Sequence, residues 1–180
     1  FEQLKIWQSR SQSRINVSVN LSGRQLNDDD IASLLGIIGK YTDLAPFITI
    51  ELTETFLMHH AQSAVSMLEK LKNAGVMLSI DDFGTGYSSL GYLKRFKVDE
   101  LKIDRLLIND IETDPNDRII ADAVIAMAHT LGLKVVAEGV ETVVQAEILR
   151  ESGCDLFQGF YFDRPLKAEV FYERYLEGKV

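Results

Sequence analysis

The chain has 180 residues, of which 46% are hydrophobic, and a formal net charge of −8 at pH 7. This composition excludes a disordered chain, and the negative charge argues against a general surface for nucleic-acid polymers or anionic membranes. The single cysteine, Cys154, excludes an internal disulfide framework and a cysteine-based zinc site.

Short apolar and β-branched runs alternate along the chain with stretches of helical periodicity. Several of these runs are apolar almost throughout, which is typical of strands that are covered on both faces. The predicted strands are Ile15–Leu21, Phe47–Leu52, Val76–Ile80, Glu100–Ile103, Lys134–Ala137 and Leu156–Phe162.

The intervening helices are predicted from their end signals and apolar stripes. Asp114-Pro115 supplies a capping carboxylate and a first-turn proline, and Gly132 ends that helix. Thr142 and Gln145 have the spacing of a capping box, at the start of a helix that ends before Gly153. The other helices are predicted over Asn27–Lys40, around the stripe Ala64, Leu68 and Leu71, and over Tyr87–Arg95.

Alternating strands and helices with short loops predict one parallel sheet with right-handed crossovers, in a single domain spanning residues 1–180. A closed (β/α)₈ barrel typically needs about 250 residues, so this chain is short by roughly two strand–helix units. Phe1–Ser9 reads as the end of a helix already under way. We therefore expect the native domain to begin before Phe1.

Polar residues recur at or near the C-terminal end of nearly every predicted strand. A barrel brings such positions to one rim, which is where barrel enzymes place their active sites. The recurring residues are Asn20, Glu51, Glu54, Asp81, Asp82, Lys102, Glu138, Glu141 and Gln158.

Six of these residues are carboxylates, which cannot share one rim unless their charge is neutralised. Oxygen ligands without cysteine or histidine favour hard ions such as Mg²⁺ or Mn²⁺. Adjacent acids such as Asp81 and Asp82 can serve two ions, with one carboxylate bridging them. Two neighbouring ions suit in-line phosphoryl chemistry, because they stabilise both the entering and the leaving oxygen.

Each residue also has a structural interpretation. Glu54 and Glu141 are the best candidates for helix caps, and Asp81-Asp82 also fits an ordinary turn. Lys102 could pair one acid structurally, because buried lysines are rare without a partner. The side-chain amide of Gln158 could merely form hydrogen bonds with backbone groups. The side chains expected at the surface or in packing are His59, His60, His129 and Cys154.

The motifs NVSVNLS, ELTE, DDFGTGYSSL, LKID, VVAEGVET and FQGFYFDRPL occur in this order. From about Ile15 to Leu166 the chain thereby resembles the EAL domain family of cyclic di-GMP phosphodiesterases. The resemblance implies a TIM-type (β/α)₈ barrel with one antiparallel strand, N-terminally incomplete in this chain. It also implies hydrolysis of cyclic di-GMP to linear pGpG with two Mg²⁺ or Mn²⁺ ions.

The resemblance also assigns roles to the rim residues. Asn20, Glu51 and Asp81 resemble ligands of the first metal, while Asp81, Asp82 and Glu138 resemble ligands of the second. Lys102 resembles the lysine that holds the attacking water and offsets developing charge, and Gln158 resembles a residue that positions water. Glu54 resembles the glutamate that anchors the DDFGTG loop and links metal binding to dimer contacts. Glu141 also matches the motif VVAEGVET, but the resemblance assigns it no firm role.

One departure concerns the family's own Glu-Ala-Leu motif, whose glutamate is a metal ligand. No such triplet occurs in the chain, and we expect it roughly two strand–helix units before Phe1. We expect the parent protein to be catalytically competent. The 180-residue chain alone is expected to be inactive or poorly folded.

Two other functions compete with the phosphodiesterase. The first is a non-catalytic cyclic di-GMP receptor or regulatory module, and the second is a different Mg²⁺-dependent barrel enzyme acting on a small carboxylate. The resemblance further implies a homodimer formed through the DDFGTG loop region, sensory or GGDEF modules in the parent chain, and a cytoplasmic domain whose parent can be membrane-anchored.

Overall fold

The strands of the protein form one parallel sheet in a computed structural model that describes residues 1–11, 14–22, 28–86 and 90–177. Each strand pairs with the next one along the chain, so the sheet order is β1-β2-β3-β4-β5-β6. The strands in this part of the chain are β1 (Val17–Asn20), β2 (Ile48–Thr53), β3 (Met77–Phe83), β4 (Glu100–Ile103), β5 (Lys134–Ala137) and β6 (Leu156–Phe157).

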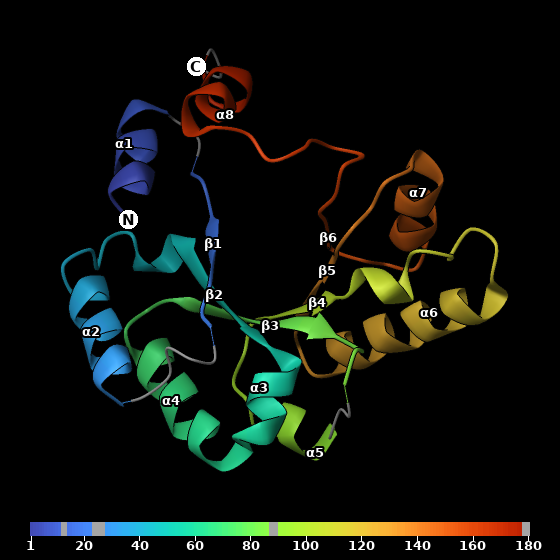
Figure 1. Cartoon of the computed structure of the whole chain (residues 1–180), viewed down its shortest axis with the longest axis horizontal. Helices are drawn as coiled ribbons and strands as arrows, with labels where there is room; N and C mark the ends of the chain where they lie inside the picture. Colours follow the sequence, from blue (N-terminus) through green and yellow to red (C-terminus); the bar gives the residue numbers. More distant parts are fainter. Residues whose placement is uncertain (12–13, 23–27, 87–89, 178–180) are drawn as a thin grey trace.

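Helices connect successive strands and cover the convex face of the curved sheet (Figure 1). No helix within the described ranges has the length and apolar character needed to cross a bilayer. The helical elements are α1 (Glu2–Arg10), α2 (Asp28–Ile38), η2 (Ala45–Phe47), α3 (Glu54–His59), α4 (Ala61–Asn73), α5 (Leu90–Leu93), η3 (Arg105–Leu107), α6 (Pro115–Thr130), α7 (Val143–Glu151) and α8 (Ala168–Tyr175).

The first and last helices, α1 and α8, lie side by side (Figure 1). The ring of Trp7 lies 5.1 Å from that of Phe171, and the Tyr172 hydroxyl donates a hydrogen bond of 3.3 Å to the Arg10 carbonyl. The two ends of the described chain are therefore joined by aromatic packing.

The core lies between the sheet and the helices on its convex face. Leu78 and Ile80 of β3, and Leu101 and Ile103 of β4, are completely buried. Because side chains alternate across a strand, the residues between them face the concave side. There the sequence places polar groups, so these strands carry an apolar outer face and a polar inner face. The expectation of strands covered on both faces is confirmed for β2 and β4, whose residues are nearly all buried, although the buried inner face is polar.

Of the six predicted strands, β4 and β5 match at both ends, β1 and β2 differ by one or two residues at each end, and β3 and β6 differ most at their C-terminal ends. β3 continues to Phe83, so Asp81 and Asp82 lie within the strand. Its pairing with β4 shifts between Ile80 and Phe83, and Asp82 has a φ of 56°. A bulge of this kind changes the direction of a side chain without ending the strand.

β6 ends at Phe157, and the predicted continuation to Phe162 is wrong because the chain turns there. The Phe162 amide donates to the Gly159 carbonyl at 3.1 Å. A Cβ at Gly159 would lie 2.1 Å from the carbonyl oxygen of Val140, so only glycine permits this approach. The chain after β6 is thus held against the loop between β5 and α7.

The predicted end signals of α6 and α7 are confirmed, whereas α2 ends at Ile38, before the predicted Lys40. The Asp114 side chain accepts from the Asn116 amide at 2.8 Å, and Thr142 forms a reciprocal capping box with Gln145. α5 is shorter than predicted, covering only residues 90–93, and residues 87–89 lie outside the described residues. Residue 27 of the predicted second helix also lies outside them.

One polar arrangement occurs twice on the side of the sheet where the strands begin. Before β4, Asp99 accepts from the Leu78 amide at 2.8 Å and donates its own amide to the Leu78 carbonyl. Before β6, Asp155 forms the same ring with Val135. In each case a basic side chain completes the arrangement, from the helix that precedes the other strand of the pair, β3 or β5.

These side chains are Lys72 of α4, 2.7 Å from Asp99, and His129 of α6, 2.8 Å from Asp155. His129 and the amide of Val135 hold the pKa of Asp155 below its ordinary value against the opposing effect of burial. Each aspartate thus fixes the register between neighbouring strands and attaches a helix to them.

The Asp99→Ala substitution is expected to lower the free energy of unfolding by about 1 to 3 kcal/mol, because it leaves the Leu78 amide and the Lys72 ammonium without their acceptor. Urea unfolding at pH 7 measures this. The matched control is Asp122→Ala on the exposed surface of α6. Equal stability of the two variants would contradict the assigned role of Asp99.

Candidate functional site

A buried lysine lies at the centre of a cluster of carboxylates on the concave face. Lys102 of β4 is only 4% exposed. Its Nζ lies 3.0 Å from Glu51 Oε2, 3.0 Å from Asp81 Oδ1 and 2.6 Å from Glu138 Oε1. Four adjacent strand units, from β2 to β5, each contribute one of these side chains.

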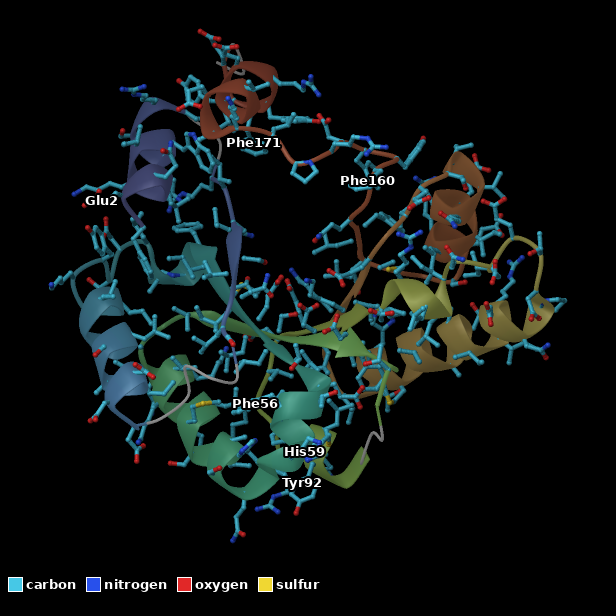
Figure 2. All side chains as sticks on the ribbon, in the orientation of Figure 1. Glu2, Phe56, His59, Tyr92, Phe160 and Phe171 are labelled. Carbon is cyan, nitrogen blue, oxygen red and sulfur yellow. The ribbon has the colours of Figure 1, made fainter. Side chains whose placement is uncertain are left out.

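The parallel sheet brings these residues together. Glu51, Asp81 and Lys102 lie near the C-terminal ends of β2, β3 and β4, and all three face the concave side. Glu138 follows β5 directly, and its amide donates to the Ile103 carbonyl at 3.1 Å. Polar side chains from the strands point into the space enclosed by the curved sheet (Figure 2). The predicted convergence of these residues on one rim is thus seen in the structure.

The charges in the cluster do not balance. Burial alone would lower the pKa of the Lys102 ammonium, but hydrogen bonds to Glu138, Asp81 and Glu51 raise it well above its ordinary value. Lys102 therefore stays protonated. Burial, together with the charges of Asp81 and Glu51, raises the pKa of Glu138 even though Lys102 opposes this effect. One ammonium is not enough for two buried carboxylates, Glu51 and Asp81, and the half-buried Glu138.

Asp82 adds a further carboxylate to the same place. Ligand oxygens of Asp81, Asp82 and Glu138 all lie within 4.8 Å of one another. Burial, followed by the charges of Asp81 and Asp104, raises the pKa of Asp82. A non-glycine residue in the left-handed region is unfavourable and tends to be kept where function requires it. The three acids form an arrangement that a divalent cation would stabilise.

Asn20, at the end of β1, completes the inner rim. One terminal atom of its amide lies 3.2 Å from Asp81 Oδ2 and 3.3 Å from Glu51 Oε2. If this atom is nitrogen, it donates to both carboxylates. If it is oxygen, three oxygens meet, and a cation among them would reconcile their charges. The position of Asn20 is therefore compatible with either a hydrogen-bonding or a ligand role.

Glu54 is fully buried at the start of α3, where its Oε2 accepts from the Gly84 amide at 3.0 Å. Thr53, not Glu54, provides the side-chain cap of α3, so the helix-cap interpretation of Glu54 is wrong. Glu141 forms an ion pair of 3.2 Å with Arg105. The loop-anchoring role of Glu54 stays a prediction, and Thr142, not Glu141, caps α7.

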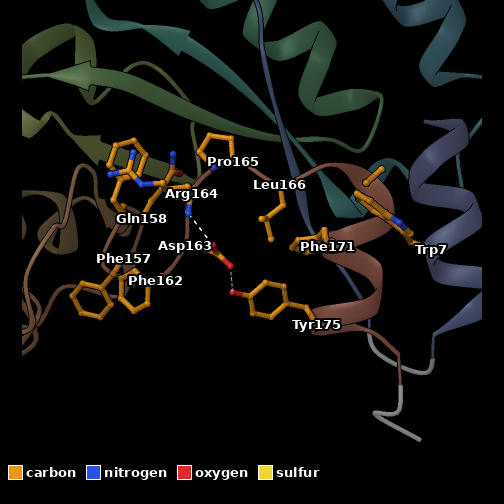
Figure 3. Close-up of a pocket in the computed structure, with 13 residues that line it drawn as sticks. Trp7, Phe157, Gln158, Phe162, Asp163, Arg164, Pro165, Leu166, Phe171 and Tyr175 are labelled. Carbon is orange, nitrogen blue, oxygen red and sulfur yellow. Dashed lines mark hydrogen bonds between the residues drawn. The ribbon is translucent and has the colours of Figure 1, made fainter.

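Gln158 follows β6 and lies between two cavities. A cavity of about 230 Å³ is lined by Gln158, Glu51, Glu100 and Lys102, among others. A second cavity of about 580 Å³ extends from Gln158 to Trp7 and Phe171, and its wall is largely aromatic (Figure 3). Gln158 thus connects the carboxylate cluster with a larger apolar space.

Two further acids near the cluster were not predicted from the sequence. Glu100 is 8% exposed, and burial raises the pKa of its carboxyl. Asp104 accepts from the Leu106 amide at 2.8 Å and contacts Asp82. Glu100 lies two residues before Lys102 in β4, a spacing that puts both on the same strand face and could have indicated it, whereas Asp104 follows the strand and caps η3. Cys154 is buried, and burial raises the pKa of its thiol to about 11, as expected for a packed thiol.

Residues 1–165 match the model of a known protein family, the EAL domain. The signaling protein YkoW of Bacillus subtilis is 41% identical over 98% of the chain, and the cyclic di-GMP phosphodiesterase NbdA of Pseudomonas aeruginosa is 47% identical over 89% of it. The chain spans only 22% and 21% of the lengths of these two relatives.

Solved structures show the same fold. The PaMucR phosphodiesterase in complex with c-di-GMP has a TM-score of 0.89 and 42% identity, over 94% of this chain and 69% of that one. A manganese and c-di-GMP complex of Klebsiella pneumoniae BlrP1 has a TM-score of 0.78 and 34% identity, over 91% of this chain and 41% of that one. The α/β barrel-type architecture expected from the sequence is thereby confirmed.

The buried carboxyl of Glu100 makes stability depend on pH in the presence of a chelator. Folding raises the pKa of this carboxyl, so the folded protein holds the proton more tightly than the unfolded chain does. The stability that goes with the protonated carboxyl is fully present below pH 4.5, its ordinary pKa, and is lost as the pH rises through the folded-state value. Glu100→Gln removes the ionisation and is expected to raise the free energy of unfolding at pH 8 by about 1 to 3 kcal/mol.

Below pH 4.5 the same substitution is expected to change stability little, because the native carboxyl is then uncharged in both states. Urea unfolding of both proteins from pH 4 to pH 8 measures the difference. A gain that is the same at every pH would contradict the assignment of a buried, poorly compensated charge to Glu100.

Proposed function

The chain belongs to the EAL domain family, and from this premise we propose that it forms the phosphodiesterase domain of a protein that hydrolyses cyclic di-GMP to linear pGpG. Two kinds of observation support this proposal. NbdA is named a cyclic di-GMP phosphodiesterase, and the PaMucR phosphodiesterase was solved with c-di-GMP. The observation that carries it is the cluster of Lys102 with Glu51, Asp81 and Glu138.

The donor set fits two divalent metal ions. We assign Asn20, Glu51 and Asp81 to the first ion, and Asp81, Asp82 and Glu138 to the second. The close approach of the last three carboxylates and the raised pKa values of Asp82 and Glu138 indicate negative charge that Lys102 does not offset. All of these ligands are oxygens, which Mg²⁺ and Mn²⁺ both accept. The manganese complex of BlrP1 supports the same class of ion.

The bound ions would supply positive charge for the phosphate oxygens and lower the pKa of a water molecule. The residues of the chain supply the remaining charge and hydrogen bonds. The Lys102 ammonium, which stays protonated, places a fixed positive charge near the point where negative charge develops. Gln158 lies beside Lys102 on the wall of the smaller cavity, where its amide can orient water. The reaction adds one water across one P–O bond.

Glu54 acts at a distance from the reacting atoms. Its hydrogen bond with Gly84 fixes the loop that directly follows Asp81 and Asp82. We propose that this contact keeps the two aspartates aligned, and that the exposed residues Thr85 and Gly86 of the same loop contribute to a homodimer contact.

The wider setting follows from the relatives. Because the chain covers about a fifth of YkoW and NbdA, we propose that its parent carries further modules, such as a sensory or GGDEF domain. MucR, which is named a bifunctional diguanylate cyclase and cyclic di-GMP phosphodiesterase, supports this combination. We place the domain in the cytoplasm, where the proposed substrate occurs, whether or not the parent is attached to a membrane.

The full-length protein is expected to convert cyclic di-GMP to pGpG in the presence of Mg²⁺ or Mn²⁺ and to lose this activity with EDTA. Asp81→Asn is expected to lower kcat at least about 100-fold, because Asp81 is assigned to both ions and also pairs with Lys102. Chromatography of the products measures hydrolysis, and Asp122→Asn on the surface of α6 is the matched control.

Two outcomes would contradict the proposal. Binding of cyclic di-GMP without turnover by the metal-loaded protein would indicate a receptor. Hydrolysis that is unchanged in Asp81→Asn would place the reaction elsewhere.

A further inference from the structure

Gln145 is a buried side chain of α7 whose amide joins two loops of the site. It is 5% exposed. Its Oε1 accepts from the amides of Glu141 and Thr142 at 2.7 and 3.2 Å. Its Nε2 donates to the carbonyl of Asn109 at 3.2 Å and, over a longer distance of 3.5 Å, to that of Ile108. Both ends of the amide are therefore used.

A capping box accounts for only part of these contacts. In a capping box, the third residue of the helix accepts from the amide of the capping residue, here Thr142. This function requires an acceptor alone, and glutamate provides it as well as glutamine does. The shorter bond from Glu141 and the two bonds donated to Asn109 and Ile108 lie outside the capping box. The donor end of Gln145 therefore has another role.

The two joined segments follow the strands that carry the shortest contact of the cluster. Residues 138–142 follow β5 and begin with Glu138, while residues 104–114 follow β4 and its Lys102. Glu138 and Lys102 are 2.6 Å apart. Gln145 thus joins the end of the loop after β5 to the middle of the loop after β4, and so connects the two strand units that hold this ion pair.

Other contacts on residues 138–142 leave the loop little freedom. Gly139 has a φ of 68°, and a Cβ there would lie 2.7 Å from the Arg105 side chain. The Val140 amide donates to the Gln158 carbonyl at 3.0 Å. With Gln145 holding its last residues, the loop is fixed to the β4 side and to the β6 side together.

We infer that Gln145 is a positioning residue, which holds Glu138 in place relative to Lys102 by joining the loop that begins with Glu138 to the loop that follows β4. This inference rests on the proposed function for its effect on turnover. The physical reason is that a buried amide with satisfied donors and acceptors resists displacement, since moving either loop breaks a hydrogen bond that is largely shielded from water.

Gln145→Glu separates this role from capping. A glutamate keeps the acceptor for Glu141 and Thr142, but its carboxylate cannot donate to Asn109 and is repelled by that carbonyl. At pH 8 we expect kcat to fall about tenfold with KM within about twofold of the native value. Protonation would restore a donor, so the ratio of variant to native kcat is expected to rise between pH 8 and pH 6.

Thr142→Ala is the matched control, because it removes the side-chain cap of α7 and leaves both ends of the Gln145 amide in place. We expect its midpoint of thermal unfolding to fall, and its kcat to stay within about twofold of the native value. A kcat loss in Thr142→Ala equal to that of Gln145→Glu would overturn the inference, since capping alone would then explain the effect.

Hydrogen exchange gives a readout that does not depend on activity. In Gln145→Met, which retains similar volume without the amide, the backbone amides of Glu141 and Thr142 are expected to exchange at least about tenfold faster than in the native protein. Unchanged exchange would overturn the inference, even if the native protein hydrolyses cyclic di-GMP. Faster exchange in a protein without hydrolysis would refute the proposed function and keep the positioning role.

Discussion

The structure depends on one buried ammonium held among carboxylates from neighbouring strands. Lys102 contacts Glu51, Asp81 and Glu138, each from a different strand unit. These contacts would be costly in isolation, since buried ions lose their hydration. They also impose a register, because the three acids can meet one Nζ only if the C-terminal ends of β2 to β5 lie at one level. The strand register that defines the fold therefore also places the side chains of the site.

The excess of acid is what makes this cluster a candidate for chemistry. A purely structural ion pair would balance its charges, whereas here the pKa values of Asp82, Glu100 and Glu138 are all raised by burial and by neighbouring acids. Stability is not improved by such an arrangement unless positive charge is added. Divalent cations would add it at the place where the reaction needs it, so the same ligands would stabilise the protein and serve catalysis.

The sequence predicts most of the architecture, because strand and helix patterns alternate clearly and β4 and β5 occur where expected. It also predicts the convergence of the acids, since residues at the ends of parallel strands share one rim. It does not predict the bulge that includes Asp82 within β3, because that depends on the pairing with β4. Nor does it predict the turn after β6, which arises from the contact of Gly159 with Val140. The bridge formed by Gln145 was hidden by its capping role, since the spacing that indicates a capping box says nothing of a donor contact more than thirty residues away.

The central claim is that the rim of oxygen ligands holds a pair of divalent ions around Asp81. Anomalous diffraction at the manganese edge, from crystals of the full-length protein grown with Mn²⁺ and cyclic di-GMP, tests it most directly. The account predicts two peaks, one beside Asn20, Glu51 and Asp81 and the other beside Asp81, Asp82 and Glu138, at about 2 Å from their oxygens. Manganese peaks elsewhere, or none at these carboxylates, would contradict it.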